Sequence, residues 1–268
     1  MKLPLSAWVS IGLLGLFFVG SLAIQWPLKM DAQSFDPNLV GGPLSPSFAH
    51  IFGTDDAGRD TLLRCLSGAK LSLSIGLVSV MMATSIGLAV GLVSGFSPRW
   101  IDAGVMRFVD FVMALPTFFL ILSIQVLLKP SIWNVVVVIG ATSWMGTARM
   151  VRASVLSLKE RPFILVARAR GLSSRRLLFK HILPHTLSPV LVSAMLGMGH
   201  AILTESVLSF LGLGVQPPCP SWGNMLEDSL SYMYQAPWMA IAPGMCIVCV
   251  VMATAVIGDA WQERIQQI

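Results

Sequence analysis

The feature that most constrains this 268-residue sequence is a series of apolar runs, most of them close to twenty residues long. An α-helix of ~20 apolar residues crosses the ~30 Å hydrocarbon core of a bilayer. Only 12% of the residues are charged, against ~25% in soluble domains, so the chain lacks the polar surface that keeps a compact globule in water. The sequence therefore predicts an all-α integral membrane protein.

Six apolar runs predict six transmembrane helices. They cover Leu5–Trp26, Leu71–Phe96, Phe108–Leu128, Ile132–Ala148, Pro189–Leu213 and Pro237–Ile257. The first run resembles a signal peptide, but it is long enough to span and lacks a clear small-residue cleavage site, so we expect it to be retained. Residues 1–70 then form a helix with an external segment, and residues 71–268 a transmembrane domain with a polar loop at 149–188.

The distribution of lysine and arginine predicts that both termini are cytoplasmic. In that orientation thirteen basic residues lie inside and five outside, and nine of the thirteen fall in the 149–188 loop. Positive charges favour the cytoplasmic side of a membrane protein. The five outside are Lys29, Arg59, Arg64, Lys70 and Lys129.

The long loop contains the signals of a short helix. Pro162 suits the first turn of a helix and Gly171 suits a left-handed stop, which predicts a helix over 162–170. Ser173 or Ser174 is expected to cap a second short helix that ends before Pro184. The first helix has apolar, charged and small side chains, which suits a protein partner or a groove better than open water.

Part of this loop resembles a known family. Ala167-Arg168-Ala169-x-Gly171, followed by Pro184 in His181-Ile182-Leu183-Pro184, resembles the EAA loop of permease subunits of binding-protein-dependent ABC importers. In that family the short helix sits in a groove of a cytoplasmic ATPase. The family's glutamate position is Leu165 here, and its first alanine is Val166. The resemblance assigns ATPase coupling to Phe163, Val166, Ala167, Arg168, Ala169, Gly171 and Pro184.

Two further segments are similar to the dipeptide, oligopeptide and nickel branch of that family. They are Gly53-Thr54-Asp55-Asp56-Ala57-Gly58-Arg59-Asp60, and Ser209-Phe210-Leu211-Gly212-Leu213-Gly214-Val215-Gln216-Pro217-Pro218 with Trp222-Gly223. The first is expected outside, facing a binding protein or gating the outer mouth. Its structural alternative is a polar turn in which Asp55 or Asp56 caps the next helix.

The resemblance implies a type I ABC permease core in a bacterial inner membrane, importing peptides or, alternatively, nickel or a metal chelate. It implies four partners: a second permease, two ATPase subunits and an external binding protein. The chain has no G-x-x-x-x-G-K-[ST] segment, so we expect ATP to be bound and hydrolysed by partner chains. The chain itself is predicted to be no enzyme, to need no cofactor and to bind no nucleic acid.

Other classes of protein and of site stay open from the residues alone. A secondary transporter also fits six spans, but it would not use an ATPase-docking helix. Asp110 is expected to pair with Arg107, while His200 and Glu205 are possible pathway residues for which structural hydrogen bonds are favoured. No metal site is predicted, although His200 leaves metal contact open. Cys246 and Cys249 suit ordinary membrane-helix positions, and a Cys65–Cys219 disulfide is conceivable.

Overall fold

The computed structural model describes residues 4–25 and 42–266, and its regular structure within these ranges is helical except for one isolated bridge between Thr54 and Asp60. The all-α prediction is confirmed, and Lys2, Trp26 and Lys29 lie outside the described residues. The helices are α1 Leu5–Gln25, α2 Thr61–Phe96, α3 Arg99–Ala114, α4 Thr117–Leu127, α5 Ile132–Thr142, α6 Met145–Lys159, α7 Pro162–Ala169, α8 Ser174–Leu177, η2 Leu178–Ile182, α9 Leu183–Phe210, α10 Trp222–Ser229, η3 Leu230–Tyr232 and α11 Trp238–Gln266.

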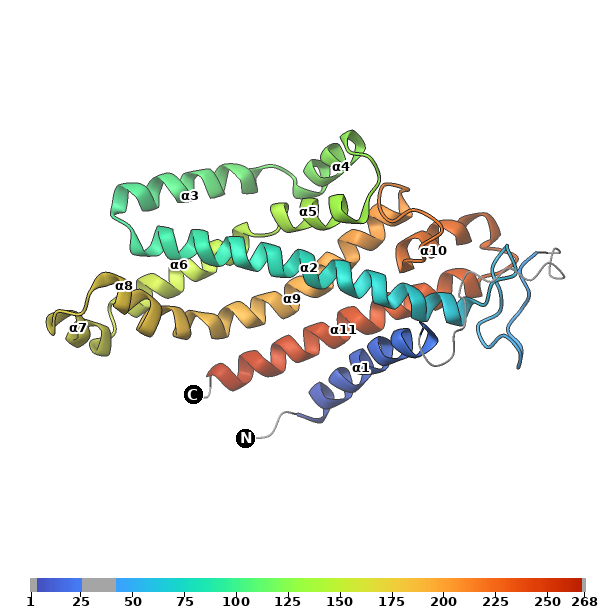
Figure 1. Ribbon diagram of the computed structural model, residues 1–268, viewed down its shortest axis with the longest axis horizontal. Helices are drawn as coiled ribbons and strands as arrows, with labels where there is room; N and C mark the ends of the chain where they lie inside the picture. Colours follow the sequence, from blue (N-terminus) through green and yellow to red (C-terminus); the bar gives the residue numbers. More distant parts are fainter. Residues whose placement is uncertain (1–3, 26–41, 267–268) are drawn as a thin grey trace.

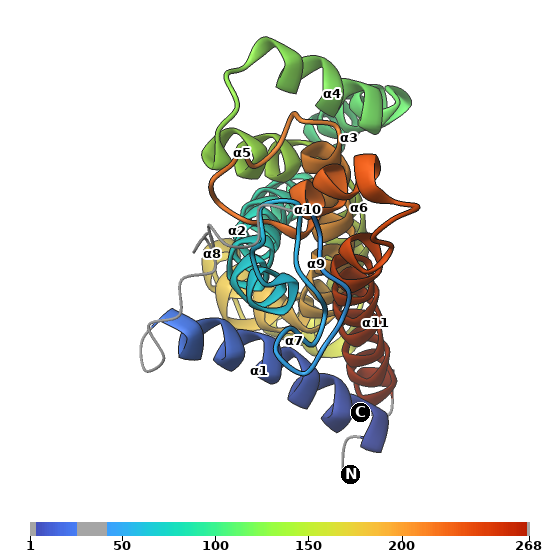
Figure 2. The ribbon, with the colours of Figure 1, turned by 90° about the vertical axis from the view of Figure 1, so that its right-hand side faces the viewer.

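The helices form an elongated bundle around α2 and α9. In the lengthwise view of Figure 1, α2, α9 and α11 run along the long axis, and α7 lies at one end. The end-on view of Figure 2 shows α1 and α11 on one side of this pair, and α3, α4 and α5 on the other. The N-terminal end of α1 and the C-terminal end of α11 both point toward the α7 end (Figure 1).

Glycines bring α2 unusually close to α6. A Cβ atom added at Gly91 would lie 2.6 Å from the carbonyl oxygen of Ala148 and 2.6 Å from Cβ of Val151. Gly87 and Gly95, one turn to either side, face Thr147 and Val155 in the same way. Because apolar lipid gives helices little hydrophobic reason to associate, such backbone packing is a main source of their attraction.

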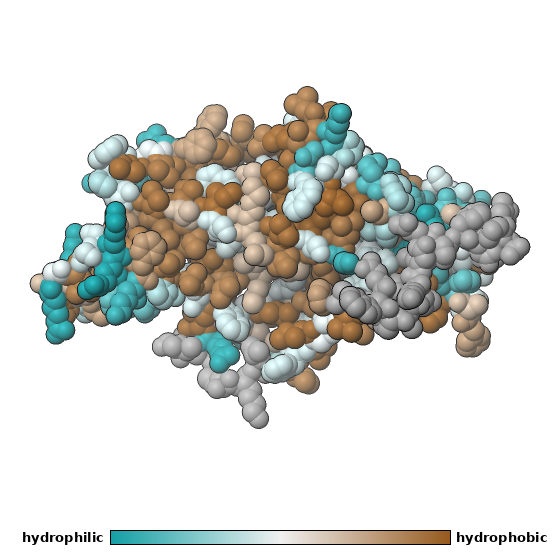
Figure 3. Space-filling view, viewed as in Figure 1, coloured by the Kyte–Doolittle hydropathy of each residue, from teal (hydrophilic) through white to brown (hydrophobic). Residues whose placement is uncertain are grey.

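Three helices are each long and apolar enough to cross a membrane within the described part of the chain. They are Thr61–Phe96, the continuous helical stretch Ser174–Phe210, and Trp238–Ile265. The bent pair of α3 and α4 is a fourth candidate, and α1 is a shorter apolar helix. Figure 3 shows hydrophobic residues over the middle of the face it presents and hydrophilic ones at the α7 end. The chain is a multi-pass membrane protein, and the count of six spans stays a prediction.

The third and fourth predicted spans are not single straight helices. α3 and α4 meet at an angle of 79°, where Leu115 takes an extended conformation before Pro116. Proline lacks the N–H that a continuing helix needs and disfavours helical geometry in the preceding residue. A second break at Ser143 and Trp144 separates α5 from α6. The spans predicted over 108–128 and 132–148 are therefore each divided between two helices.

Helices also extend far beyond the predicted apolar boundaries. α2 starts at Thr61, so the division at residue 70 falls inside a helix, and α6 continues to Lys159 within the predicted loop. The second short helix does not end before Pro184, because a π-helical turn at Leu178–Ile182 leads directly into α9. Pro184 lies in the first turn of α9 directly after this π turn, so the proline does not end the helix. Hydropathy marks only the part of a helix that lies in lipid. The helix itself continues beyond that part, because its backbone hydrogen bonds also form in polar surroundings.

Reporter fusions test the orientation. A topology reporter joined after Gly42, or after the fully exposed Tyr234, is expected to read extracytoplasmic, and one joined after Ser174 cytoplasmic. The basis is the thirteen-to-five charge asymmetry. A cytoplasmic signal at Gly42 would reverse the assignment.

Candidate functional site

The predicted short helix is present as α7, at the polar end of the bundle between α6 and α8 (Figure 1). Pro162 occupies its first turn, and Gly171, with φ of +79°, follows its end. Proline loses no hydrogen bond at the start of a helix, and glycine takes positive φ without a Cβ penalty. The helix predicted over 162–170 is therefore confirmed to within one residue.

One face of α7 is anchored in the bundle and another is free. Ile164 is 1% exposed and packs with Val151 and Val155 of α6. Leu165 and Val166 are each 51% exposed, and Phe163 is 43% exposed. Neighbouring apolar side chains left open on a fixed helix suit contact with another protein. The free face therefore consists of Leu165 and Val166, with Phe163 at its edge, where its ring also packs against the ring of His185 in α9.

The other residues assigned to coupling differ in burial. Ala167 is half-buried against the same cluster as Ile164, so it belongs to the anchored face. Arg168, Ala169, Gly171 and Pro184 are exposed.

Burial, reinforced by the charge of Arg168, lowers the pKa of the nearby Lys159.

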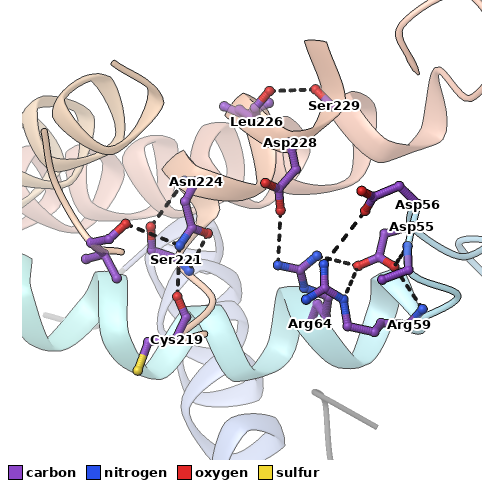
Figure 4. Close-up of polar contacts among 12 residues, drawn as sticks. Asp55, Asp56, Arg59, Arg64, Cys219, Ser221, Asn224, Leu226, Asp228 and Ser229 are labelled. Atoms are coloured by element: carbon purple, nitrogen blue, oxygen red, sulfur yellow. Dashed lines mark hydrogen bonds and ion pairs between the residues drawn. The ribbon is translucent and has the colours of Figure 1, made fainter. Parts of the chain in front are cut away.

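At the opposite end, Asp55 is the centre of the Gly53–Asp60 segment (Figure 4). Asp55 is 3% exposed, and its carboxylate accepts hydrogen bonds from Arg59 Nε at 2.6 Å, from the backbone N–H groups of Ala57 and Arg59, and from Arg64 Nη1. Arg64, 6% exposed, also reaches Asp228 of α10 at 3.2 Å. This buried ion-pair network fastens the segment to α2 and α10.

The remaining residues of this segment are also engaged within the chain. Gly53 has φ of +68°, and a Cβ there would lie 2.6 Å from the Leu44 carbonyl oxygen, while Gly58 has φ of +72°. The Thr54 hydroxyl accepts from the Leu44 N–H at 2.8 Å. Asp60, and neither Asp55 nor Asp56, caps α2 by accepting from the Leu63 N–H at 3.0 Å. The segment is thus a folded clasp, and any contact with a binding protein would have to use its outer surface.

The second motif surrounds Glu205, which is fully buried. Ser209 donates to Glu205 Oε1 at 2.7 Å and accepts from the Val215 N–H at 3.0 Å, and Ser72 of α2 donates to Oε2 at 3.1 Å. The indole of Trp222 donates to the Cys65 carbonyl oxygen at 2.9 Å. This network ties the chain after α9 to α2, and within it Glu205 makes the hydrogen bonds that its favoured structural role requires.

A cavity of about 350 Å³ lies where the two helix breaks meet α2 and α9. Irregular backbone at membrane depth is tolerated where it lines a wet cavity or is buried in protein. His200 is the one titratable side chain among the described residues that line it. The hydroxyl groups of the lining come from Ser79, Thr84, Thr117, Thr142, Ser143, Thr147 and Ser193. The cavity therefore offers neutral hydrogen-bonding groups.

Comparison with known proteins decides the family. Residues 87–267 match the family of binding-protein-dependent transport system inner membrane components. The chain belongs to this family. The permease is 39% identical over 258 residues to the dipeptide transport system permease protein DppC of Alkalihalophilus pseudofirmus, with 95% of this chain and 85% of the relative covered. It is 34% identical to the oligopeptide transport system permease protein OppC of Bacillus subtilis, with 95% and 84% covered.

A solved structure shares the fold. A chain of the MetNI methionine ABC transporter in an inward-facing conformation matches with a TM-score of 0.59 at 20% identity, covering 77% of the permease and 95% of that chain. The predicted ABC-importer permease fold is therefore confirmed. Membership in a binding-protein-dependent family also favours an importer subunit over the secondary-transporter alternative.

Two smaller predictions, one about an ion pair and one about a disulfide, have outcomes. Asp110 pairs with Arg149 of α6 instead of Arg107, because the neighbouring helix brings a closer cation than its own. All four cysteines are free, with Cys65 buried and Cys219 exposed, so the conceivable disulfide is absent. No group of three or more potential metal ligands occurs among the described residues.

Sequence reasoning missed two sets of residues. The cavity hydroxyls are scattered over five helices and the break at Ser143, and their only signal was polar side chains recurring within apolar runs. The pair of Asp102 and Arg152 is separated by fifty residues and gave no local signal.

Proposed function

We propose that this permease forms half of the membrane pathway of an ATP-driven peptide importer in a bacterial inner membrane. The observation that supports this proposal most strongly is that α7 has one face anchored in the bundle and one free apolar face. This arrangement suits a helix held by a cytoplasmic ATPase. Its partners would be a second permease, two ATPase subunits that bind and hydrolyse ATP, and an external binding protein. The permease itself carries no nucleotide and no cofactor in this scheme.

Peptides suit the cavity better than bare metal ions. Its hydroxyl groups can hydrogen-bond the amide and carbonyl groups that every peptide carries. Nickel would favour several imidazole ligands, whereas the cavity offers His200 alone among its described lining residues. The two relatives named above are dipeptide and oligopeptide permeases, which supports the same choice.

Uptake measurements test this proposal. Cells that carry the complete transporter are expected to accumulate radiolabelled dialanine, and deletion of this permease should abolish that uptake. His200→Ala should lower uptake by no more than about tenfold, the effect of one hydrogen bond. Accumulation of nickel instead of dialanine, lost in His200→Ala, would contradict the peptide proposal.

A further inference from the structure

Two ion pairs join α3 to α6 in the half of the bundle that carries α7. Arg152 holds Asp102 through Nε at 2.5 Å and Nη2 at 2.6 Å, and the Ser94 hydroxyl of α2 donates to the same carboxylate. Arg149 holds Asp110. The Arg152 and Asp102 side chains are 33% and 13% exposed, while those of Arg149 and Asp110 are about half exposed. The bidentate, better shielded Asp102–Arg152 pair is therefore the stronger link.

α6 connects this pair to α7. Val151 and Val155, on either side of Arg152 in the sequence, pack against Ile164 of α7. The same two valines contact Gly91 and Gly95 of α2. Because α6 is a continuous helix and its contacts are close-packed, a displacement of α7 has to move Arg152 or break this packing.

On α3, the carboxylate belongs to a stripe that ends at the cavity. Asp102, Met106, Val109 and Met113 follow one another at helical spacings of four, three and four residues, which places them on one face. Met106 is 9% exposed and Val109 is fully buried, and both pack against Met145 at the start of α6. Met113 lines the cavity. One packed face thus runs from the ion pair to the cavity wall.

We propose that the Asp102–Arg152 pair is the contact through which displacement of α7 moves the cavity wall at Met113. Both residues are positioning residues, since neither lines the cavity. The inference rests on the proposed function, in which an ATPase displaces α7. Neutralising the pair should uncouple the two ends of the permease, because a rigid element transmits motion only through contacts that hold.

The first test measures ATP hydrolysed per dialanine imported by the complete transporter in proteoliposomes. Asp102→Asn should raise this ratio by about fivefold or more, with the ATPases still bound because α7 is untouched. Arg152→Lys keeps the charge but loses the bidentate fork. The ratio for this variant should therefore lie between that of the parent transporter and that of Asp102→Asn. Glu263→Gln removes an exposed carboxylate of α11 outside this linkage and should leave the ratio unchanged.

The second test does not depend on the substrate. In the complete transporter, alkylation of the Met113→Cys variant by a maleimide is measured with and without ATP plus vanadate, and the rate of the parent protein is subtracted. Nucleotide should change the rate by about fivefold or more, and Asp102→Asn should remove this dependence. The exchange Asp102→Arg/Arg152→Asp should restore part of the nucleotide dependence, because it re-forms the ion pair with the charges swapped. The restoration should be incomplete, because arginine in the first turn of α3 is unfavourable next to the positive end of the helix dipole.

Three results would overturn the inference. One is an equal nucleotide effect on Met113→Cys with and without Asp102→Asn. Another is no nucleotide effect while the pair is intact. The third is uptake and hydrolysis falling together in Asp102→Asn at an unchanged ratio. A transporter that imports no dialanine would refute the proposed substrate, while the alkylation result would still decide the linkage.

Discussion

The double substitution Leu165→Asp/Val166→Asp is expected to abolish peptide uptake while leaving the permease folded in the membrane. Both side chains are about half exposed on α7, so the permease alone tolerates the charges. In the assembled transporter they would be covered by the ATPase, and an uncompensated buried charge costs about 3–5 kcal/mol. That cost corresponds to a loss of about a hundredfold or more in affinity for the ATPase.

The measurement pairs co-purification of the ATPase with uptake of labelled dialanine. Ser157→Asp is a matched control, because it adds a carboxylate at an exposed position of α6 outside the free apolar face. It should retain both activities. Ile164→Asp would instead put a charge into the buried cluster with Val151 and Val155, so it should reduce the amount of folded permease. Normal uptake and ATPase binding by the double variant would show that α7 is not the coupling element.

The substitution Asp55→Ala is expected to destabilise the whole permease and to lower its amount in the membrane. It leaves the buried guanidinium of Arg64 without its main partner, and breaking a buried ion pair costs about 3–5 kcal/mol. Asp56→Asn is the matched control. Its carboxylate is 39% exposed and lies 3.7 Å from Arg59, so its removal should cost less than ~1 kcal/mol.

Thermal unfolding of the detergent-purified permease, together with its abundance in the membrane, distinguishes the two roles of this segment. A lower unfolding temperature for Asp55→Ala, with Asp56→Asn unchanged, identifies the clasp as structural. Unchanged stability combined with lost uptake would instead assign Asp55 to contact with the external binding protein, contradicting the structural reading.

The sequence alone determined the features that depend on local chemistry. Apolar runs marked the membrane helices because hydrocarbon excludes charge, and Pro162 and Gly171 bounded α7 because each has a fixed backbone preference. The family resemblance rested on ordered motifs and was confirmed. The sequence did not determine which face of α7 each side chain occupies. Ala167 fits the free face as well as the anchored one until α6 and α8 are placed around it.

Only the tertiary structure decided the features that depend on distant partners. Asp110 pairs with Arg149 and Asp102 with Arg152 because α3 and α6 lie side by side, which no local spacing specifies. Asp55 became a structural centre because Arg59 and Arg64 converge on it, and Arg64 in turn reaches Asp228 of α10. The breaks at Pro116 and Ser143 matter because both open onto one cavity. Local preference sets where a helix can start or stop, while packing between helices sets what each side chain meets.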